Sequence, residues 1–390
     1  MSFSVTNPVT DLIDPVLLTQ ESVRCKSITP ADDGALENLA QPLSRMGFDI
    51  HRLRFEQEGY DPIDNIFARR GTTGRHLCYM GHTDVVPAGR ESDWTHPPFA
   101  ANIENGILYG RGVADMKGGN CAFVAAVSRF LNERPDFGES ISLLITGDEE
   151  AKAVNGTVKV IDWMREQKHM PDVALVGEPS NTNHMGEMIR VGRRGSLNGK
   201  IMVRGIQGHS AYPERSDNPV PHLVRLLSRL IDEKLDHGTA DFPPSHIVIS
   251  SVDVGNPAPN VIPARAEALF NIRFNDTWNA AKLESHLRHI LDAINPNYEM
   301  DVWCNAQSFV TVNHPWRDIV LAAVEKISGK KPRADTGGGT SDARFIAQDC
   351  PVVEYGLLNT TIHKIDEHAP VADIETLTAT YTEILRSYFA

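Results

Sequence analysis

The chain has 390 residues, a formal net charge of −13 and a hydrophobic fraction of 41%, which is enough for about two domains with apolar cores. The acidic balance argues against a non-specific nucleic-acid binder, because binding to phosphates needs a basic surface. No apolar run reaches the roughly 18 residues that a membrane-spanning helix needs, so we expect no membrane partner.

The N-terminus and the cysteines indicate the compartment. Residues 1–6 lack the basic region and the apolar core of a signal peptide. The cysteines are odd in number, far apart in sequence and without a zinc or disulfide pattern: Cys25, Cys78, Cys121, Cys304 and Cys350. We therefore expect most of them to be buried thiols in a reducing cytoplasm.

Hydrophobic periodicity predicts alternating strands and helices in the first half of the chain. A helical pattern over residues 11–48 is broken at Pro30, and Asn105-Gly106 marks a hairpin turn. The further strands expected are residues 48–55, 65–69, a run that begins at Leu77, 140–146 and 173–176, and the further helices expected are residues 121–131 and 156–167. This alternation predicts an α/β fold with a mixed, mainly parallel sheet flanked by helices.

Polar side chains follow three of these apolar strands. His82 and Asp84 end the first, Glu149 and Glu150 the second, and Glu178 the third. Chemistry collects at the carboxyl ends of the strands in open α/β sheets. A Gly-rich segment before the helix at residue 121 forms a tight turn that presents a further acid, Asp115.

The pattern changes near Arg193. Residues 194–305 read as β-α-β-β-α-β, the order of a ferredoxin-like unit, and we expect them to form an inserted α+β domain. The first pattern then resumes with a helix over 316–328, a Gly-rich turn over 336–342, a strand over 351–355 and a closing helix over 374–389. The expected domains are therefore 1–193 and 306–390 for the main α/β domain and 194–305 for the insertion.

The strand-end residues and a later histidine, His363, form one set with a single chemical character. It consists of imidazole nitrogens and carboxylate oxygens without a cysteine, and such ligands suit zinc, manganese or cobalt. One metal needs about three protein ligands, so the set is large enough for two metals with one bridging carboxylate. Adjacent strand-end acids such as Glu149 and Glu150 point in different directions, so one can bind metal while the other faces a substrate.

The chain resembles the M20 metallopeptidase/deacylase family over essentially its whole length. The segments that carry the resemblance are Met80-Gly81-His82-Thr83-Asp84-Val85-Val86-Pro87, Tyr109-Gly110-Arg111-Gly112-Val113-Ala114-Asp115-Met116-Lys117-Gly118-Gly119, Thr146-Gly147-Asp148-Glu149-Glu150, Val176-Gly177-Glu178-Pro179 and Thr361-Ile362-His363-Lys364. The resemblance implies a zinc-aminopeptidase-like catalytic domain and a dimerisation domain in the insertion.

The resemblance also implies residue roles. His82, Asp115 and Glu178 would hold one Zn²⁺, and Asp115, Glu150 and His363 the other, with Co²⁺ as a possible substitute. Glu149 would be the general base and Asp84 would orient His82. His209, within Gly208-His209-Ser210-Ala211, would cross the interface of a homodimer to the partner's active site.

Three further segments indicate the substrate: Val191-Gly192-Arg193-Arg194-Gly195-Ser196, Asn256-Pro257-Ala258-Pro259-Asn260-Val261-Ile262-Pro263 and Thr336-Gly337-Gly338-Gly339-Thr340-Ser341-Asp342-Ala343-Arg344-Phe345. The resemblance implies the small molecule N-succinyl-LL-2,6-diaminopimelate. Its carboxylates call for guanidinium groups, which bind a carboxylate in bidentate fashion, and the candidates are Arg193 and Arg273. Neutral donors are expected from Asn260, Thr340, Ser341 and Asn359.

Two alternatives remain open from the sequence. In the first, the chain is another M20 deacylase or peptidase, such as one that acts on N-acetylornithine. In the second, it is a metal-bound but inactive binding protein. The absence of Glu149 or His209 would have favoured the second alternative, and both residues are present.

Overall fold

The computed structural model describes residues 12–390, so the segment over residues 1–6 lies outside the described residues. The described chain folds as two compact units. The first comprises residues 12–191, Thr311–Asp335 and Ser341–Ala390, and the second comprises Gly192–Val310 and Thr336–Thr340. The second unit begins and ends within a few residues of the expected insertion, and it also includes part of the Gly-rich turn.

The first unit is built on one sheet of eight strands within the described residues. In spatial order these are β1 (Asp49–Gln57), β2 (Tyr60–Arg70), β6 (Ser140–Thr146), β3 (His76–His82), β7 (Val173–Val176), β18 (Val352–Glu354), β8 (Met188–Arg190) and β17 (Arg333–Asp335). The central strands β6, β3, β7 and β18 are parallel, whereas β1, β2 and β8 pair antiparallel with a neighbour. The predicted mixed α/β sheet is thus confirmed.

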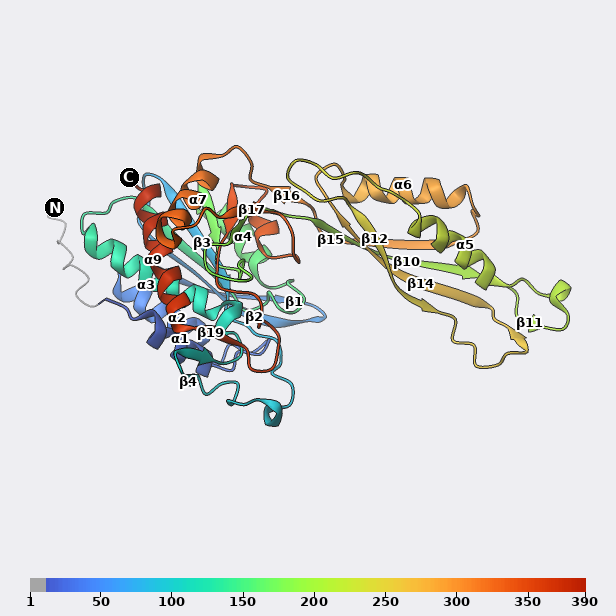
Figure 1. Cartoon of the computed structure of the whole chain (residues 1–390), viewed down its shortest axis with the longest axis horizontal. Coiled ribbons are helices and arrows are strands. Elements are labelled where there is room, and N and C mark those ends of the chain that lie inside the picture. The colour runs from blue at the N-terminus through green and yellow to red at the C-terminus, as the bar shows by residue number, and fades with distance from the viewer. Residues whose placement is uncertain (1–11) are drawn as a thin grey trace. The chain divides into compact units, whose positions relative to one another are not determined.

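Helices cover both faces of this sheet. They are α1 (Pro15–Arg24), α2 (Ala35–Arg45), α3 (Gly118–Glu133), α4 (Thr157–Glu166), α7 (Pro315–Ser328), α8 (Ala343–Ile346) and α9 (Val371–Tyr388). Tyr79 of β3 stacks on Phe123 of α3 with ring centroids 4.2 Å apart, and α1 and α9 pack beside α3 (Figure 1). The strand register places Phe67 of β2 on the opposite face, where it contacts Trp163 of α4.

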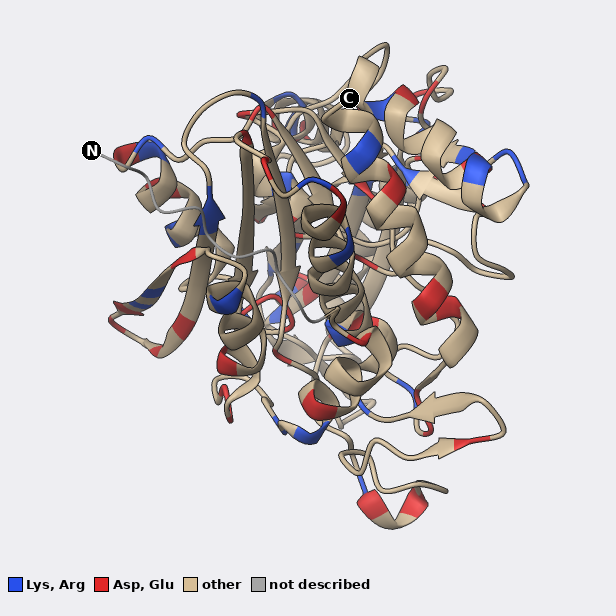
Figure 2. Cartoon of the chain, turned by 90° about the vertical axis from the view of Figure 1, so that its left-hand side faces the viewer, with Lys and Arg blue, Asp and Glu red and all other residues tan. Residues whose placement is uncertain are grey.

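The middle of the sheet is apolar because it is covered on both sides. Every residue of β3, β6 and β7 is buried, and none is Lys, Arg, Asp or Glu. Figure 2 shows the charged residues of the first unit mainly on its helices and loops. Parallel strands with both faces covered are typically rich in apolar residues and free of charged ones. A separate small sheet in this unit joins β4 (Ile103–Glu104), β5 (Ile107–Tyr109) and β19 (His368–Pro370).

The second unit is a four-stranded antiparallel sheet with two helices on one face, within the described residues (Figure 1). The strands lie in the order β12 (His246–Asp253), β14 (Arg265–Phe274), β10 (Gly195–Arg204) and β15 (Glu299–Ala306), and the helices are α5 (Pro219–Ile231) and α6 (Ala280–Asp292). This is the predicted ferredoxin-like arrangement. Two short pairs complete the unit, β11 (Gly208–His209) with β13 (Val261–Ile262) and β9 (Gly192–Arg193) with β16 (Phe309–Val310).

The core of the second unit forms between the helices and one face of its sheet. Leu226 and Leu230 of α5 and Leu287 of α6 pack with Ile201 and Phe270 of the strands, and all five are buried. Burial of such side chains stabilises a fold by about 1.5–3 kcal/mol each relative to exposure. No helix in the described part of the chain has the length and apolar character needed to cross a membrane.

Candidate active site

The first unit brings the strand-end residues together at one edge of its sheet. His82 is the last residue of β3, while Glu149 and Glu150 follow β6 and Glu178 follows β7. These three strands are adjacent and parallel, so their carboxyl ends meet. Asp115 lies in the turn Val113–Lys117 that precedes α3, and His363 lies on the loop between β18 and β19.

Within the described residues, these side chains form overlapping groups that could hold metal ions. One group is His82, Asp115 and Glu178, and another is Asp115, Glu150 and His363. In each group the ligand atoms lie within 4.8 Å of one another. Asp115 belongs to both groups, with Oδ1 3.3 Å from His82 Nε2 and Oδ2 3.4 Å from His363 Nε2. These are the two ligand sets that the family resemblance implies.

The remaining contacts tighten the two groups. His82 Nε2 lies 3.8 Å from Glu178 Oε1, and His363 Nε2 lies 2.8 Å from Glu150 Oε1. A third group in the described chain combines His82 with Glu149 and Glu150. The donor atoms are two imidazole nitrogens and several carboxylate oxygens, which fits a divalent cation such as zinc or cobalt.

The electrostatics of the site show how strongly its acids favour a positive charge. Burial alone would lower the pKa of His82, but hydrogen bonds with Asp115 and Asp84 raise it well above its ordinary value. Hydrogen bonds with Asp115 and Glu150 raise the pKa of His363 to about 10. Burial and the charge of Asp115 raise the pKa of Glu178 well above its usual range. Bound cations would take over the neutralisation that protons supply here.

Within the described residues, Glu149 forms no hydrogen bond or ion pair with a histidine, whereas its neighbour Glu150 contacts His363 at 2.8 Å. Burial raises the pKa of Glu149 to about 8, and the charge of the buried Asp342 adds to the effect. Glu149 also lies outside the two ligand groups that share Asp115. It belongs only to the third group, with His82 and Glu150.

Asp84 connects His82 to the acidic pair. His82 Nδ1 lies 2.9 Å from the main-chain oxygen of Asp84 and 3.5 Å from its carboxylate, so the carbonyl is the nearer partner. A carbonyl oxygen only accepts, so in the neutral ring Nδ1 carries the proton and Nε2 is left for a metal. The Asp84 carboxylate accepts the N–H groups of Glu149 (3.2 Å) and Glu150 (3.1 Å) and the hydroxyl of Thr29 (2.8 Å).

His209 and Asn260 lie side by side in the second unit. His209 is part of β11, which pairs with β13, and the Ser210 N–H donates to the Asn260 main-chain oxygen at 3.0 Å. The His209 side chain is exposed, and its Nδ1 accepts the N–H of Ala211 at 3.0 Å. These two predicted residues therefore share one local structure.

The predicted arginines lie elsewhere in the second unit. Arg193 belongs to β9 and is buried, and its Nη1 donates to the main-chain oxygens of Gly337 (3.4 Å) and Gly339 (3.2 Å) in the Gly-rich turn. Arg273 belongs to β14 and is half-buried, and burial together with the charge of Arg194 lowers its pKa. In Figure 1, β11 and β16, the strand that pairs with β9, lie at opposite ends of the second unit.

The neutral donors predicted from the sequence differ in their availability. Ser341 is buried, and its hydroxyl donates to Glu354 Oε1 at 2.6 Å, so its one proton already has an acceptor. Thr340 and Asn359 are half-buried. The main-chain N–H of Asn359 donates to the main-chain oxygen of Asn181 at 2.8 Å, so this hydrogen bond does not use the Asn359 side chain.

Sequence reasoning missed several polar residues that shape this site. Asn120 of α3 donates to the main-chain oxygen of His82 at 2.7 Å and accepts the Tyr79 hydroxyl at 3.1 Å. Thr29 and Asp342 were missed as well. Thr29 donates to the Asp84 carboxylate, and the charge of Asp342 raises the pKa of Glu149. Asn120 could have been found, because it is a polar residue in the first turn of α3, directly before the apolar run over residues 121–127. The others are recognised only by long-range contacts.

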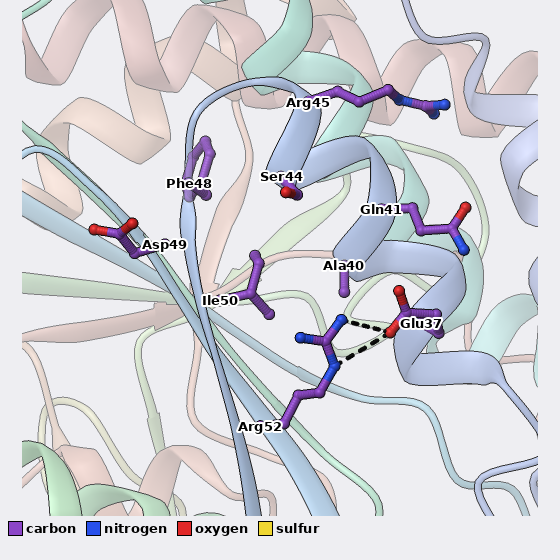
Figure 3. A pocket seen from close by; sticks show the side chains of 9 residues that line it. All are labelled: Glu37, Ala40, Gln41, Ser44, Arg45, Phe48, Asp49, Ile50 and Arg52. Carbon is purple, nitrogen blue, oxygen red and sulfur yellow. Dashed lines mark hydrogen bonds and ion pairs between the residues drawn. The ribbon is translucent and has the colours of Figure 1, made fainter.

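A pocket outside this site lies between α2 and β1 (Figure 3). It has a volume of about 520 Å³ and is lined by Glu37, Ala40, Gln41, Ser44, Arg45, Phe48, Asp49, Ile50 and Arg52. Arg52 Nη2 forms an ion pair with Glu37 Oε2 at 2.7 Å, and both side chains are exposed. The lining has no histidine or cysteine, so this pocket lacks the ligands found at the sheet edge.

The chain belongs to the peptidase family M20/M25/M40, which matches residues 78–387. It is therefore a hydrolase that acts on amide bonds. Among its relatives, it is 50% identical to succinyl-diaminopimelate desuccinylase of Rhodospirillum centenum over 377 residues, which are 97% of this chain and 98% of the relative. It is also 50% identical to succinyl-diaminopimelate desuccinylase of Methylobacterium nodulans, with 96% of each chain covered.

A solved structure supports the same fold. An M20 family metallo-carboxypeptidase from Sulfolobus solfataricus superposes with a TM-score of 0.76 and covers 96% of this chain and 99% of its own. The two sequences are 18% identical, so the likeness concerns the fold alone.

Proposed function

We propose that this chain hydrolyses N-succinyl-LL-2,6-diaminopimelate to succinate and LL-2,6-diaminopimelate in bacterial lysine and cell-wall biosynthesis, in the cytoplasm. The observation that carries the proposal is the 50% identity, over nearly the whole length of both chains, to relatives named succinyl-diaminopimelate desuccinylase. The contacts at the sheet edge support it.

The proposed cofactor is a pair of Zn²⁺ ions, for which Co²⁺ can substitute. His82, Asp115 and Glu178 would hold one ion, and Asp115, Glu150 and His363 the other. The support is the donor chemistry of the two groups and the shared position of Asp115. When bound, the ions supply positive charge that makes a water more acidic and polarises the amide carbonyl.

The proposed general base is Glu149. Its carboxylate takes a proton from the attacking water, whose oxygen forms a bond to the succinyl carbonyl carbon. The C–N bond then breaks, and Glu149 gives the proton to the leaving nitrogen, which becomes the amine of diaminopimelate. Two features support this role: Glu149 lies outside the two ligand groups that share Asp115, and the pKa of its half-buried side chain is raised to about 8 by burial.

Recognition of the substrate is assigned to Arg193 and Arg273, because planar guanidinium groups bind carboxylates in bidentate fashion. Thr340, Asn359 and Asn260 are the proposed neutral side-chain donors. The Ser341 hydroxyl is engaged by Glu354, so Ser341 is assigned a smaller part in binding than the sequence predicts.

The proposed assembly is a homodimer in which His209 reaches the partner's active site and stabilises the developing oxyanion. Such a donor contributes about 3 kcal/mol to a transition state. The support is that β11 and β16 lie at opposite ends of the second unit in Figure 1, so His209 and Arg193 are distant within that unit. Asn260 is hydrogen-bonded next to His209 and would accompany it.

The experiment that tests the proposal measures turnover by metal-stripped protein while Zn²⁺ is added back stepwise. N-succinyl-LL-2,6-diaminopimelate and N-acetylornithine are assayed in parallel. We expect turnover of the succinyl compound that rises until about two ions are bound per chain. Turnover of the acetyl compound instead would overturn the substrate assignment, and metal binding without turnover of either would favour a binding protein.

A further inference from the structure

Glu367 is a buried acid that lies next to the candidate metal ligands without being one of them. Its Oε1 accepts the main-chain N–H groups of Ala114 (3.0 Å) and Asp115 (3.2 Å). Its main-chain oxygen accepts the N–H of Gly110 at 2.9 Å. Glu367 therefore contacts both the turn that presents Asp115 and the segment just before that turn.

Arg111, which lies just before this turn, binds the other carboxylate oxygen of Glu367. Its Nη1 donates to Glu367 Oε2 at 2.6 Å, and the two side chains are 3% and 1% exposed. The guanidinium also lies over the ring of Trp94, 5.2 Å from the centroid. Both carboxylate oxygens of Glu367 are thus engaged, Oε1 by the turn and Oε2 by Arg111.

The loop that carries His363 also contacts the residue after Trp94, through the residue before Glu367. Asp366 accepts the N–H and the hydroxyl of Thr95, both at 2.8 Å. Asp366 and His363 have φ values of 57° and 60°, which L residues rarely adopt. The loop therefore has a specific backbone shape, and Glu367 joins its end to the turn that carries Asp115.

We propose that Glu367 and Arg111 are positioning residues that set the spacing between Asp115 and His363. Asp115 Oδ2 and His363 Nε2 lie 3.4 Å apart although the residues come from distant parts of the chain. One buried carboxylate links the two segments, because it accepts N–H groups from one and belongs to the other. The inference rests on the proposed function, in which these two residues bind the same metal ion.

The competing interpretation is that the Arg111–Glu367 pair only stabilises the fold. Removing one partner of a buried ion pair is destabilising in either case, because a charge is left without its partner. A loss of stability alone therefore cannot separate the two roles. Metal affinity can, because residues that orient metal ligands typically change it by about 10- to 100-fold when they are replaced.

The test compares four proteins: wild type, Glu367→Ala, Glu367→Gln and the control Glu375→Ala. Glu375 pairs with Arg129 at 2.9 Å on the exposed face of α9, away from both ligand segments. Each protein is stripped of metal, and three quantities are measured: the melting temperature of the metal-free form, the Kd for Co²⁺ by competition with a chelator, and the visible absorption spectrum of bound Co²⁺.

We expect Glu367→Ala to bind Co²⁺ about 10- to 100-fold more weakly than wild type at the Asp115–His363 position, with a changed spectrum. Glu367→Gln keeps an oxygen that can accept the two N–H groups, so it should recover part of that affinity. Glu375→Ala should match wild type. A lower melting temperature with a Co²⁺ affinity within about twofold of wild type would overturn the inference.

Two further outcomes keep the test decisive. If Glu367→Ala does not fold, Arg111→Lys takes its place, because lysine keeps the charge but cannot reproduce the geometry of the guanidinium. An unchanged Co²⁺ affinity and spectrum in Arg111→Lys would again overturn the inference. Failure of wild-type protein to bind Co²⁺ at all would instead contradict the proposed function, so the two failures are distinguishable.

Discussion

Single residues at this site owe their roles to their partners rather than to their type. Glu149 and Glu150 are adjacent and identical in chemistry, yet only Glu150 contacts His363. The Asp84 carboxylate accepts both of their N–H groups and so fixes where the two side chains begin. From that shared anchor Glu150 reaches His363, while the Glu149 carboxylate lies beside His82 and Glu150.

Replacing Glu149 by Gln tests its role as the base. The amide has nearly the shape of the carboxylate but cannot accept the proton, so we expect kcat to fall about 10²- to 10⁴-fold. KM and metal content should stay near their wild-type values. Glu150→Gln is the matched control and should lose metal instead. Steady-state kinetics and metal analysis check both variants, and a fall in kcat of less than about tenfold would contradict the assignment.

His76 is a buried histidine away from the site, and it predicts how stability depends on pH. Its Nε2 lies 2.7 Å from the Ser142 hydroxyl and its Nδ1 lies 3.2 Å from the Met170 main-chain oxygen. Burial, together with the charge of Arg69, lowers the pKa of His76 to about 4. Its value in the unfolded chain is about 6.5, so the unfolded chain binds this proton first as pH falls.

The contribution of His76 to the free energy of unfolding is therefore complete above about pH 6.5 and falls as the pH falls. At about pH 4 the loss amounts to about 3 kcal/mol. His76→Gln removes this dependence. We expect the stability difference between metal-free wild type and this variant to narrow by that amount between pH 7 and pH 4 in urea unfolding. The exposed His289→Gln is the control, and a constant difference would contradict the prediction.

At the scale of single elements, β10 shows how a strand is shaped by its neighbour. Gly195 and Gly199 pair in register with Phe274 and Phe270 of β14. A Cβ built on Gly199 would lie 2.2 Å from Phe270 Cζ, so the ring occupies the space that a side chain would fill. Phe270 in turn packs in the core beneath α5 and α6, and cannot easily move aside.

Gly199→Ala should therefore destabilise the second unit by about 1–3 kcal/mol, as overpacking of a core typically does. Gly138→Ala is a suitable control, because the nearest atom to its Cβ would be 4.0 Å away and its backbone does not require glycine. That control should be neutral or slightly stabilising. Urea unfolding measures both. Equal stability of Gly199→Ala and wild type would show that the ring yields at no cost.

At the scale of the whole molecule, the residues assigned to one reaction are divided between two units of the chain. His82, Asp115, Glu149 and His363 belong to the first unit, while His209 and Asn260 belong to the second. If a second copy of the chain supplies His209, the dimer is needed for turnover and not only for stability. A symmetric pair of chains would then hold two complete sites.

Mixing two inactive variants tests this arrangement. A hybrid of His209→Ala and Glu149→Ala chains contains one site with an intact Glu149 and a partner's intact His209. After statistical exchange of subunits we expect about a quarter of wild-type activity, because half of the dimers are hybrids with one working site each. Each variant incubated alone is the control. No recovery in the mixture would place His209 in the site of its own chain or outside the reaction.

The alternation of elements, and the positions where polar residues follow apolar strands, could be predicted from local sequence patterns. Buried strands such as β3 and β6 have a local signature, and adjacent parallel strands end at a common edge, so His82, Glu149 and Glu178 could be placed together. Short strands such as β8 and β17 were missed, because three residues carry no periodicity.

The contacts of each polar group, in contrast, follow from the three-dimensional fold. The Asp84 carboxylate holds the acidic pair, the Ser341 hydroxyl is taken by Glu354, and Glu367 binds the turn that presents Asp115. These partners are far apart along the chain, and hydrogen bonds and ion pairs between distant segments leave no periodic trace in a sequence. They exist because a buried donor or acceptor must find a partner wherever the fold brings one.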